Sequence, residues 1–227
     1  MMMNHRKISY FIFLCLLSVQ IYSQQDSLNM IKYTADFKFN EGIYISFDQV
    51  KNNSPIPKTR IISTVGYDNP NFFQKIIDQR RFYYYDNIGN KNEMTVKNIW
   101  GYSRNGFLYI NYNGDFYRIT IIGSICHFVS NYTTYSSNYN PYYRNTYYDP
   151  YYSPASAVPS TEARQYLLDF STGRVADFDT EGVELLLMND TELYDEYVEL
   201  RRKKKRQLKY FYIRKYNEKH PLYFPEK

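Results

Sequence analysis

Short runs of aromatic and β-branched residues, separated by turn-forming pairs, dominate residues 80–129. Two Asn-Gly pairs, Asn105-Gly106 and Asn113-Gly114, enclose the run 107–112. Asn-Gly is the preferred pair for a tight type I′ hairpin turn, because both residues tolerate positive φ. The pattern predicts an antiparallel meander. Its strands are expected near 99–103, 107–112 and 116–122, with a continuation over 124–129.

Further strands and hairpins are predicted on both sides of the meander. Upstream, residues 42–47 and 61–65 are expected to be strands, and 81–85 with 93–96 to form a hairpin. Downstream, 165–170 and 174–178 flank a turn in which Gly173 takes the left-handed conformation. Ser46 is expected to cap one helical turn at 47–51. Residues 71–79 fit either a short helix or a further strand of the sheet.

Helical spacing of apolar residues replaces the strand pattern after residue 180. Thr180 is expected to cap a short helix that ends near Asn189. Asn189 with Glu192 resembles a capping box for a second, longer helix. Apolar residues at helical spacing continue from Leu193 to Phe211, and Pro221 ends the pattern. The sequence does not decide whether this helix is continuous or bends at the basic residues within it.

Together these patterns predict an α+β fold: an antiparallel β-meander or a small barrel-like sheet with a C-terminal helical segment. We expect a single domain over 36–220, preceded by a lead-in at 24–35 and followed by a tail at 221–227. Residues 130–160 interrupt it, since Tyr, Pro, Ser and Asn replace the aliphatic residues there. That composition predicts a long low-complexity loop.

The N-terminus has the parts of a secretory signal peptide. Arg6 and Lys7 precede an apolar run over 8–19, and Ser23 is a small residue before a polar stretch. We predict cleavage after Ser23, with an uncleaved anchor as the alternative. The protein is then exported, to the periplasm or to the cell surface and beyond, with no transmembrane span after signal removal.

Composition narrows the functional classes. Only two cysteines are present, which excludes a disulfide framework and a four-thiolate zinc site. With Cys15 in the signal peptide, Cys126 is expected to be a buried apolar residue, with a disulfide between two chains as the alternative. Beyond the N-terminus no 18 consecutive residues are apolar, which excludes a protein with many membrane spans.

Six consecutive cations form the most prominent charged feature. The net charge is +5, and such a run attracts polyanions, whether acidic polysaccharide or an anionic lipid surface. An export signal argues against nucleic acid. The alternative is a solvated charged helix, in which the nine acids of residues 176–199 balance the cations and Glu199 pairs with Lys203. The candidate polyanion contacts are Arg201, Arg202, Lys203, Lys204, Lys205 and Arg206.

Tyrosines are concentrated in the predicted loop. Their rings can stack on sugars or other aromatic groups, at little cost in rotamer entropy. The alternative is a tolerated insertion with no contact role. The candidate stacking residues are Tyr142, Tyr143, Tyr147, Tyr148, Tyr151 and Tyr152.

Signatures of catalysis are weak. Cys126 and His127 are adjacent on a predicted strand, so their side chains are expected on opposite faces and cannot act as a nucleophile and its base. No ligand spacing indicates a metal, and no cofactor motif is present. Paired carboxylates support glycoside hydrolysis in other proteins; the least implausible here are Asp169, Asp177 and Asp179.

Four segments, 41–48, 99–102, 122–128 and 213–221, resemble conserved exported proteins of unknown function from Bacteroidota. The resemblance implies a Gram-negative envelope setting and transfers no catalytic residue. We therefore favour an exported, non-catalytic envelope- or surface-associated protein that binds a polymer or a protein partner. The rival is a hydrolase of envelope polymers with paired carboxylates. A third possibility is a subunit that acts only when docked on a partner.

Overall fold

The computed structural model describes residues 29–136 and 158–226. The chain divides into two compact units, and Lys32–Phe224 contains nearly all the described residues. The predicted signal peptide lies outside the described residues. Two short strands, β1 (Met30–Lys32) and β12 (Tyr223–Pro225), form a two-stranded sheet. Phe224, in the segment expected to be a tail, is buried against Phe37 and Phe39.

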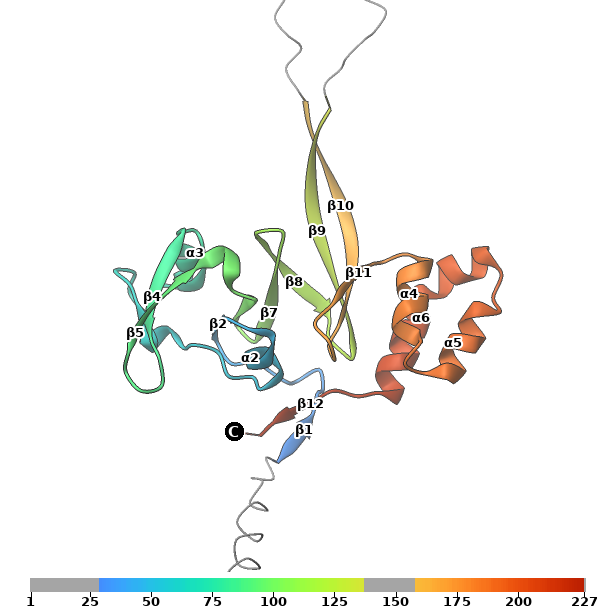
Figure 1. Cartoon of the computed structure of the whole chain (residues 1–227), viewed down its shortest axis with the longest axis horizontal. Helices are drawn as coiled ribbons and strands as arrows, with labels where there is room; N and C mark the ends of the chain where they lie inside the picture. Colours follow the sequence, from blue (N-terminus) through green and yellow to red (C-terminus); the bar gives the residue numbers. More distant parts are fainter. Residues whose placement is uncertain (1–28, 137–157, 227) are drawn as a thin grey trace, which may run out of the picture. The chain divides into compact units, whose positions relative to one another are not determined.

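A seven-stranded antiparallel sheet is the centre of the larger unit (Figure 1). Its strand order is β11-β10-β9-β8-β7-β6-β2. The strands are β2 (Gly42–Tyr44), β6 (Gly101–Arg104), β7 (Phe107–Tyr112), β8 (Asp115–Ile121), β9 (Ile125–Ser136), β10 (Val158–Asp169) and β11 (Val175–Asp177). The predicted α+β fold with an antiparallel meander is confirmed. The outermost strands are β2 and β11, which do not pair with each other, so the described residues form no closed barrel. An isolated bridge joins Ile43 of β2 to Ile56.

The Asn-Gly turns have the backbone that the sequence predicts. Asn105 and Gly106 have φ of 53° and 77°, and Asn113 and Gly114 have φ of 56° and 92°. These values place both residues of each pair in the left-handed region, as a type I′ turn requires. The two turns therefore set the register of β6, β7 and β8.

A smaller three-stranded sheet, ordered β3-β4-β5, packs with a short helix. Its strands are β3 (Ile61–Ile62), β4 (Arg81–Tyr85) and β5 (Lys91–Thr95), and the helix is α3 (Phe72–Ile77). The ambiguous segment 71–79 is thus helical, because both phenylalanines and both isoleucines of α3 point into one apolar cluster. Helix α2 (Phe47–Lys51) is capped by Ser46, as expected. Two 3₁₀ turns, η2 (Lys58–Arg60) and η3 (Val96–Asn98), connect these elements.

The long hairpin β9–β10 corrects the limits of the predicted loop. Residues 130–136 and 158–160 were expected to be loop, but they are strand, with Ser136 opposite Val158. The residues between them lie outside the described part of the chain. Backbone pairing depends little on side-chain polarity, so strands extend into the Tyr- and Ser-rich sequence without an aliphatic stripe.

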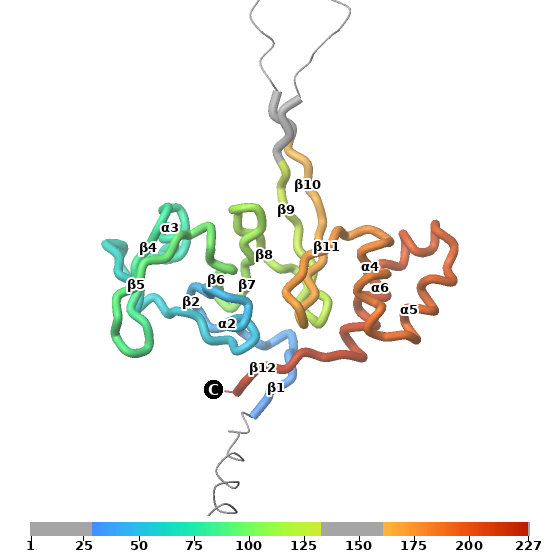
Figure 2. The backbone as a smooth tube through the Cα atoms, in the orientation of Figure 1, coloured from blue at the N-terminus to red at the C-terminus, as the bar shows by residue number. Residues whose placement is uncertain are grey.

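Three helices follow β11 (Figure 2): α4 (Thr180–Leu187), α5 (Thr191–Val198) and α6 (Arg202–Lys219). The predicted caps were each off by one residue. Asp179, not Thr180, accepts the N–H of Gly182, and Asp190, not Asn189, accepts the N–H of Leu193. The expected long helix is broken between α5 and α6, ahead of most of the basic residues.

Candidate functional site

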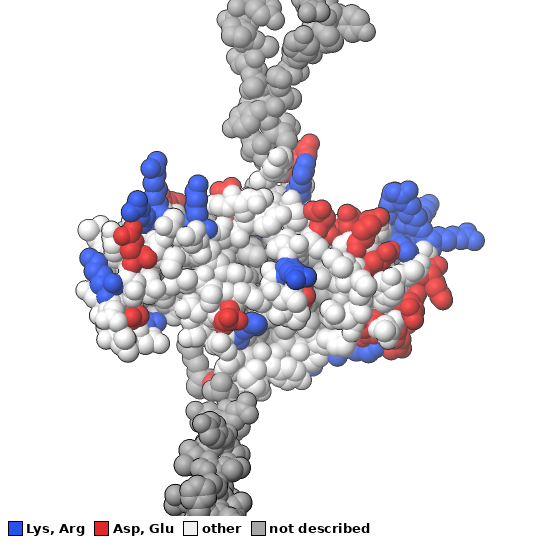
Figure 3. Space-filling view, in the orientation of Figure 1, with Lys and Arg blue, Asp and Glu red and all other residues white. Residues whose placement is uncertain are grey.

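The cationic cluster, defined as Arg201–Arg206, forms the start of α6. Arg201 is the N-cap residue, and the other five cations occupy the first turns. Figure 3 shows Lys and Arg side chains gathered at the α5–α6 connection, beside Asp and Glu side chains. The sequence alternative placed these cations late in one long helix, where the dipole favours them. The break places them at the positive end of α6, where the dipole disfavours cations.

Only part of the cationic cluster has partners in the fold. The Lys205 ammonium lies 2.7 Å from a Glu184 carboxylate oxygen, and the Tyr197 hydroxyl donates to the Lys205 carbonyl. Arg201, Arg202, Lys203, Lys204 and Arg206 are exposed. Within residues 29–136 and 158–226 their side chains form no ion pair.

Three of the nine acids expected to balance this cluster, Asp190, Glu192 and Glu196, pair with lysines outside it. Glu196 binds Lys215 at 2.6 Å, and Glu192 binds Lys219 at 2.7 Å. The expected Glu199–Lys203 pair does not form, because α5 ends at Val198 and the i,i+4 geometry is lost. The cluster is therefore balanced less completely than the sequence suggested.

The six candidate stacking tyrosines, Tyr142 to Tyr152, lie outside the described residues. Tyr132, at the start of the tyrosine-rich stretch, is exposed on β9. The Arg164 guanidinium lies over the Tyr132 ring, 4.5 Å from its centroid. This contact shows one ring of the stretch accepting a cation on its face.

Cys126 and His127 point to opposite faces of β9, as predicted. The Cys126 thiol is fully buried, and burial raises its pKa to about 12. His127 contacts Gln165 Oε1 at 3.0 Å and the Tyr210 hydroxyl at 3.1 Å. Burial lowers the pKa of His127. The two groups share no site.

The three aspartates named for hydrolysis are not brought together as an acid pair. Asp169 accepts hydrogen bonds from the hydroxyls of Ser171 and Thr172 in the β10–β11 turn. Asp179 caps α4, and Asp177 lies on β11 opposite Tyr166. Burial raises the pKa of Asp169, but the turn hydrogen bonds lower it more, so this carboxyl is held ionised. The described residues contain no cluster of three or more metal-ligating side chains.

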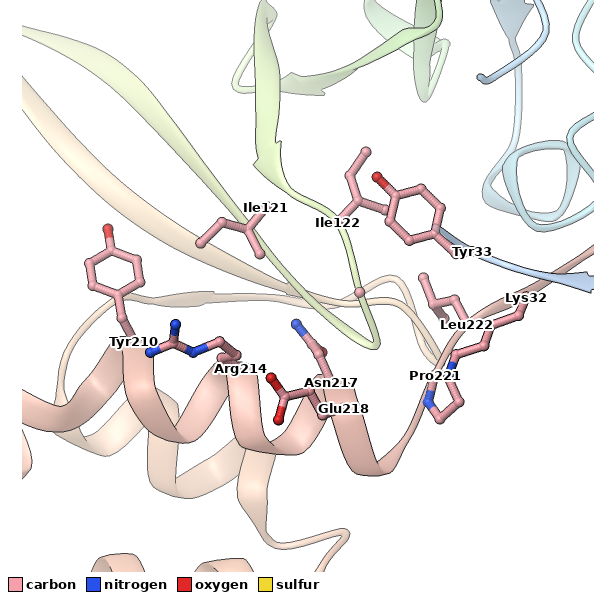
Figure 4. A pocket seen from close by; sticks show the side chains of 11 residues that line it. Lys32, Tyr33, Ile121, Ile122, Tyr210, Arg214, Asn217, Glu218, Pro221 and Leu222 are labelled. Atoms are coloured by element: carbon pink, nitrogen blue, oxygen red, sulfur yellow. The ribbon is translucent and has the colours of Figure 1, made fainter. Parts of the chain in front are cut away.

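An apolar cleft of about 570 Å³ lies beside α6 (Figure 4). Ile121, Ile122 and Leu222 supply apolar walls, and Arg214 and Glu218 of α6 line it as well. The side-chain amide of Asn217 bonds both the N–H and the carbonyl of Ile125, which attaches α6 to β9. The segments that line this cleft are far apart in the sequence, so no local sequence pattern could predict it.

A polar cleft of about 420 Å³ lies between α3, the β7–β8 turn and β9. Most of its lining side chains carry a hydrogen-bonding group. Sequence reasoning missed this cleft, because its residues come from four separate segments, none of which carries a recognisable motif. They are Gln74, Ile77, Asp78, Tyr102, Gly114, Asp115, Phe116, Tyr117 and Asn131.

None of the helices in the described part of the chain is both long and apolar enough to cross a membrane. Comparison of the chain with protein-family models, with curated proteins and with solved structures finds no match.

Proposed function

We propose that this protein is exported and non-catalytic, and that it binds an anionic polymer of the cell envelope through the cationic cluster. The observation that carries the proposal is the placement of this cluster at the start of α6. Cations there oppose the helix dipole, at a typical cost of about 0.3–1 kcal/mol each. A sequence that keeps five of the six exposed and without an ion pair within the described residues, all but Lys205, gains little stability from them.

The cationic cluster is also suited to a flexible polymer. Lys205 is held by Glu184, so the first turns of α6 have a defined position on α4. The neighbouring cations project from that support. Adjacent charges on one helix end create a local positive potential that an anionic chain meets at several points at once.

Export and an envelope setting are parts of the same proposal. They are supported by the signal-like N-terminus and by the resemblance to exported Bacteroidota proteins. Tyr142, Tyr143, Tyr147, Tyr148, Tyr151 and Tyr152 are proposed as a second contact that stacks on the polymer.

The test measures binding of the purified protein to lipopolysaccharide, acidic capsular polysaccharide and peptidoglycan, at low and high salt. The triple variant R201Q/K203Q/K204Q removes three of the unpaired charges and keeps a residue of good helix propensity at the two positions within α6. We expect roughly tenfold weaker binding of the triple variant at low salt, and loss of wild-type binding at high salt.

A matched control removes the same number of positive charges as this triple variant, at positions outside the cationic cluster. The variant K75Q/R80Q/K97Q neutralises three exposed cations on or near α3 and β5. The control is expected to bind like the wild type. Equal losses in both triple variants would mean that net charge alone drives binding, and unchanged binding in the first would remove the cationic cluster from the proposal.

The rival hydrolase gains no support from the aspartates on which it rested, since Asp169 and Asp179 are engaged in a turn and a cap. Failure of all three polymers to bind would favour a protein partner. The apolar cleft beside α6 is then the first surface to vary.

A further inference from the structure

The polar cleft combines oriented hydrogen-bond acceptors, a tyrosine hydroxyl donor and aromatic residues. We propose that it binds a sugar ring of a neutral oligosaccharide. This inference does not depend on the cationic cluster, which lies on a different helix, and it assigns a ligand class to residues that the proposed function leaves unused. The volume of about 420 Å³ is in the range of sites for small organic molecules.

Two carboxylates in the lining are positioned but only partly used. The Gln74 amide donates to Asp78 Oδ1 at 3.0 Å. The Tyr117 hydroxyl shares its proton between Asp115 Oδ2, at 3.4 Å, and the carbonyl oxygen of Asn131, at 3.2 Å. Each bond orients its carboxylate and leaves the second oxygen available. Neither aspartate forms an ion pair within the described residues. Both therefore present acceptors for hydroxyl donors.

Tyr102 supplies a hydroxyl donor carried on a buried ring. The residue is only 4% exposed and lines the cleft, and its hydroxyl forms no hydrogen bond with another described residue. No side-chain polar atom of the described residues is both fully buried and unpaired, so this hydroxyl reaches the open space of the cleft and can donate to a ligand oxygen there. The ring is fixed by stacking on Tyr109, with centroids 4.7 Å apart, and by the edge of Phe116.

The Tyr102 hydroxyl keeps its proton at any physiological pH. Burial, followed by the neighbouring Tyr109, raises the pKa of Tyr102 to about 12, and the Asp78 carboxylate adds to the effect. The group is thus a permanent donor beside permanent acceptors. A sugar hydroxyl both donates and accepts, so a ring with adjacent hydroxyls satisfies Tyr102 and a carboxylate together.

The remaining lining also fits a sugar better than a cation. The Asn131 side chain lines the cleft with both a donor and an acceptor, and forms no hydrogen bond in the described part of the chain. A lysine or arginine side chain offers donors only, so it leaves the Tyr102 proton and the Asn131 amide protons without acceptors. Phe116 and Tyr117 add aromatic rings to the lining, and aromatic rings suit the apolar C–H side of a pyranose.

The experiment titrates the purified protein with neutral tetrasaccharides built on glucose, mannose, galactose or N-acetylglucosamine. Binding is followed by calorimetry and by saturation-transfer NMR. We expect at least one tetrasaccharide to bind, with an affinity that high salt does not change, because no ligand charge is involved. Y102F and D115N are each expected to weaken binding about tenfold, since each loses a hydrogen bond to the sugar.

Two matched variants separate the cleft from general effects on the fold. Y109F keeps the ring stack and removes a hydroxyl that does not line the cleft, and D195N changes an exposed carboxylate on α5. Both variants are expected to bind the sugar like the wild type. Thermal unfolding of all four variants tests whether each one is folded. The proposal is overturned if no tetrasaccharide binds at millimolar concentration, if Y102F and D115N bind normally, or if arginine amide binds where the sugars do not.

Discussion

At the scale of single residues, Asp190 joins more of the C-terminal helical part than any other carboxylate. It caps α5 through the Leu193 N–H, and it contacts Lys219 at 2.9 Å and His220 Nε2 at 2.6 Å. One carboxylate therefore attaches the start of α5 to the end of α6. Burial raises the pKa of Asp190, but the hydrogen bonds from His220 and Lys219 outweigh that effect and bring it to about 2.

This arrangement predicts an acid-sensitive contribution to stability. The folded pKa lies below the unfolded value, so the carboxylate stabilises the fold at pH above about 4 and this stabilisation is lost as the pH falls toward 2. Asp190→Asn keeps a good N-cap residue and removes the charge. We expect it to cost about 1–2 kcal/mol at pH 7 and to remove this component of the acid transition, measured by urea unfolding from pH 2 to 7.

Asp195→Asn, an exposed change on the same helix, is the control and is expected to follow the wild-type curve. Parallel pH dependence in Asp190→Asn and the wild type would show that the Asp190 charge is not coupled to folding.

At the scale of elements, two positions in the meander require glycine for different physical reasons. A Cβ at Gly101, on β6, would collide with the Tyr109 carbonyl oxygen across the strand pair. At Gly114, in the β7–β8 turn, φ is +92° but no atom lies within 4 Å of the added carbon. The first position needs glycine for space, and the second needs it for conformation.

Gly101→Ala is therefore expected to destabilise the protein by more than about 3 kcal/mol, because β6 and β7 must separate. Gly114→Ala is expected to cost only about 1 kcal/mol. Chemical denaturation of both variants measures the difference. Equal losses would mean that β6 shifts to accommodate the methyl group, and the close approach at Gly101 would not be a constraint.

A second prediction at this scale concerns how the cations at the start of α6 affect the stability of the fold. Neutralising Arg201, Lys203 and Lys204 in the triple variant removes cations from the positive end of the helix dipole. We expect unfolding free energy at low salt to stay the same or to rise, by up to about 1 kcal/mol, while polyanion binding falls. A drop in stability of more than about 1 kcal/mol in calorimetry or denaturation would show that these cations support the fold instead.

At the scale of the whole larger unit, the sheet is buried on both faces at the base of β9 and β10. Cys126 and Leu168 belong to one apolar cluster, and Ile125 and Leu167 belong to another that includes the helices α4 to α6. Adjacent residues on a strand point to opposite faces of the sheet. The consecutive apolar residues at the base of β9 and β10 therefore pack into two apolar clusters, one on each face. The helices thus pack on the sheet, and the sheet face that carries His127 is covered by Tyr210 of α6.

Several features were predictable from sequence because they depend on local backbone preferences. The Asn-Gly turns, the Ser46 cap and the order of strands before helices follow from φ preferences and short-range hydrogen bonds. The opposite directions of Cys126 and His127 follow from strand geometry alone. The helix caps were close but misplaced, since Asp179 and Asp190 stand beside other residues that can also cap.

The sequence by itself determined the fold class and the hairpins, because each rests on contacts between residues near in the chain. Only the tertiary structure decided where the long helix breaks, which cations lose their partners, and that Tyr102 faces a cleft between α3, β8 and β9. Those features depend on segments that are distant in sequence and meet only on folding. The break at 199–201 is the clearest case: helical spacing continues through it, and packing of α5 and α6 into one apolar cluster requires the chain to turn there.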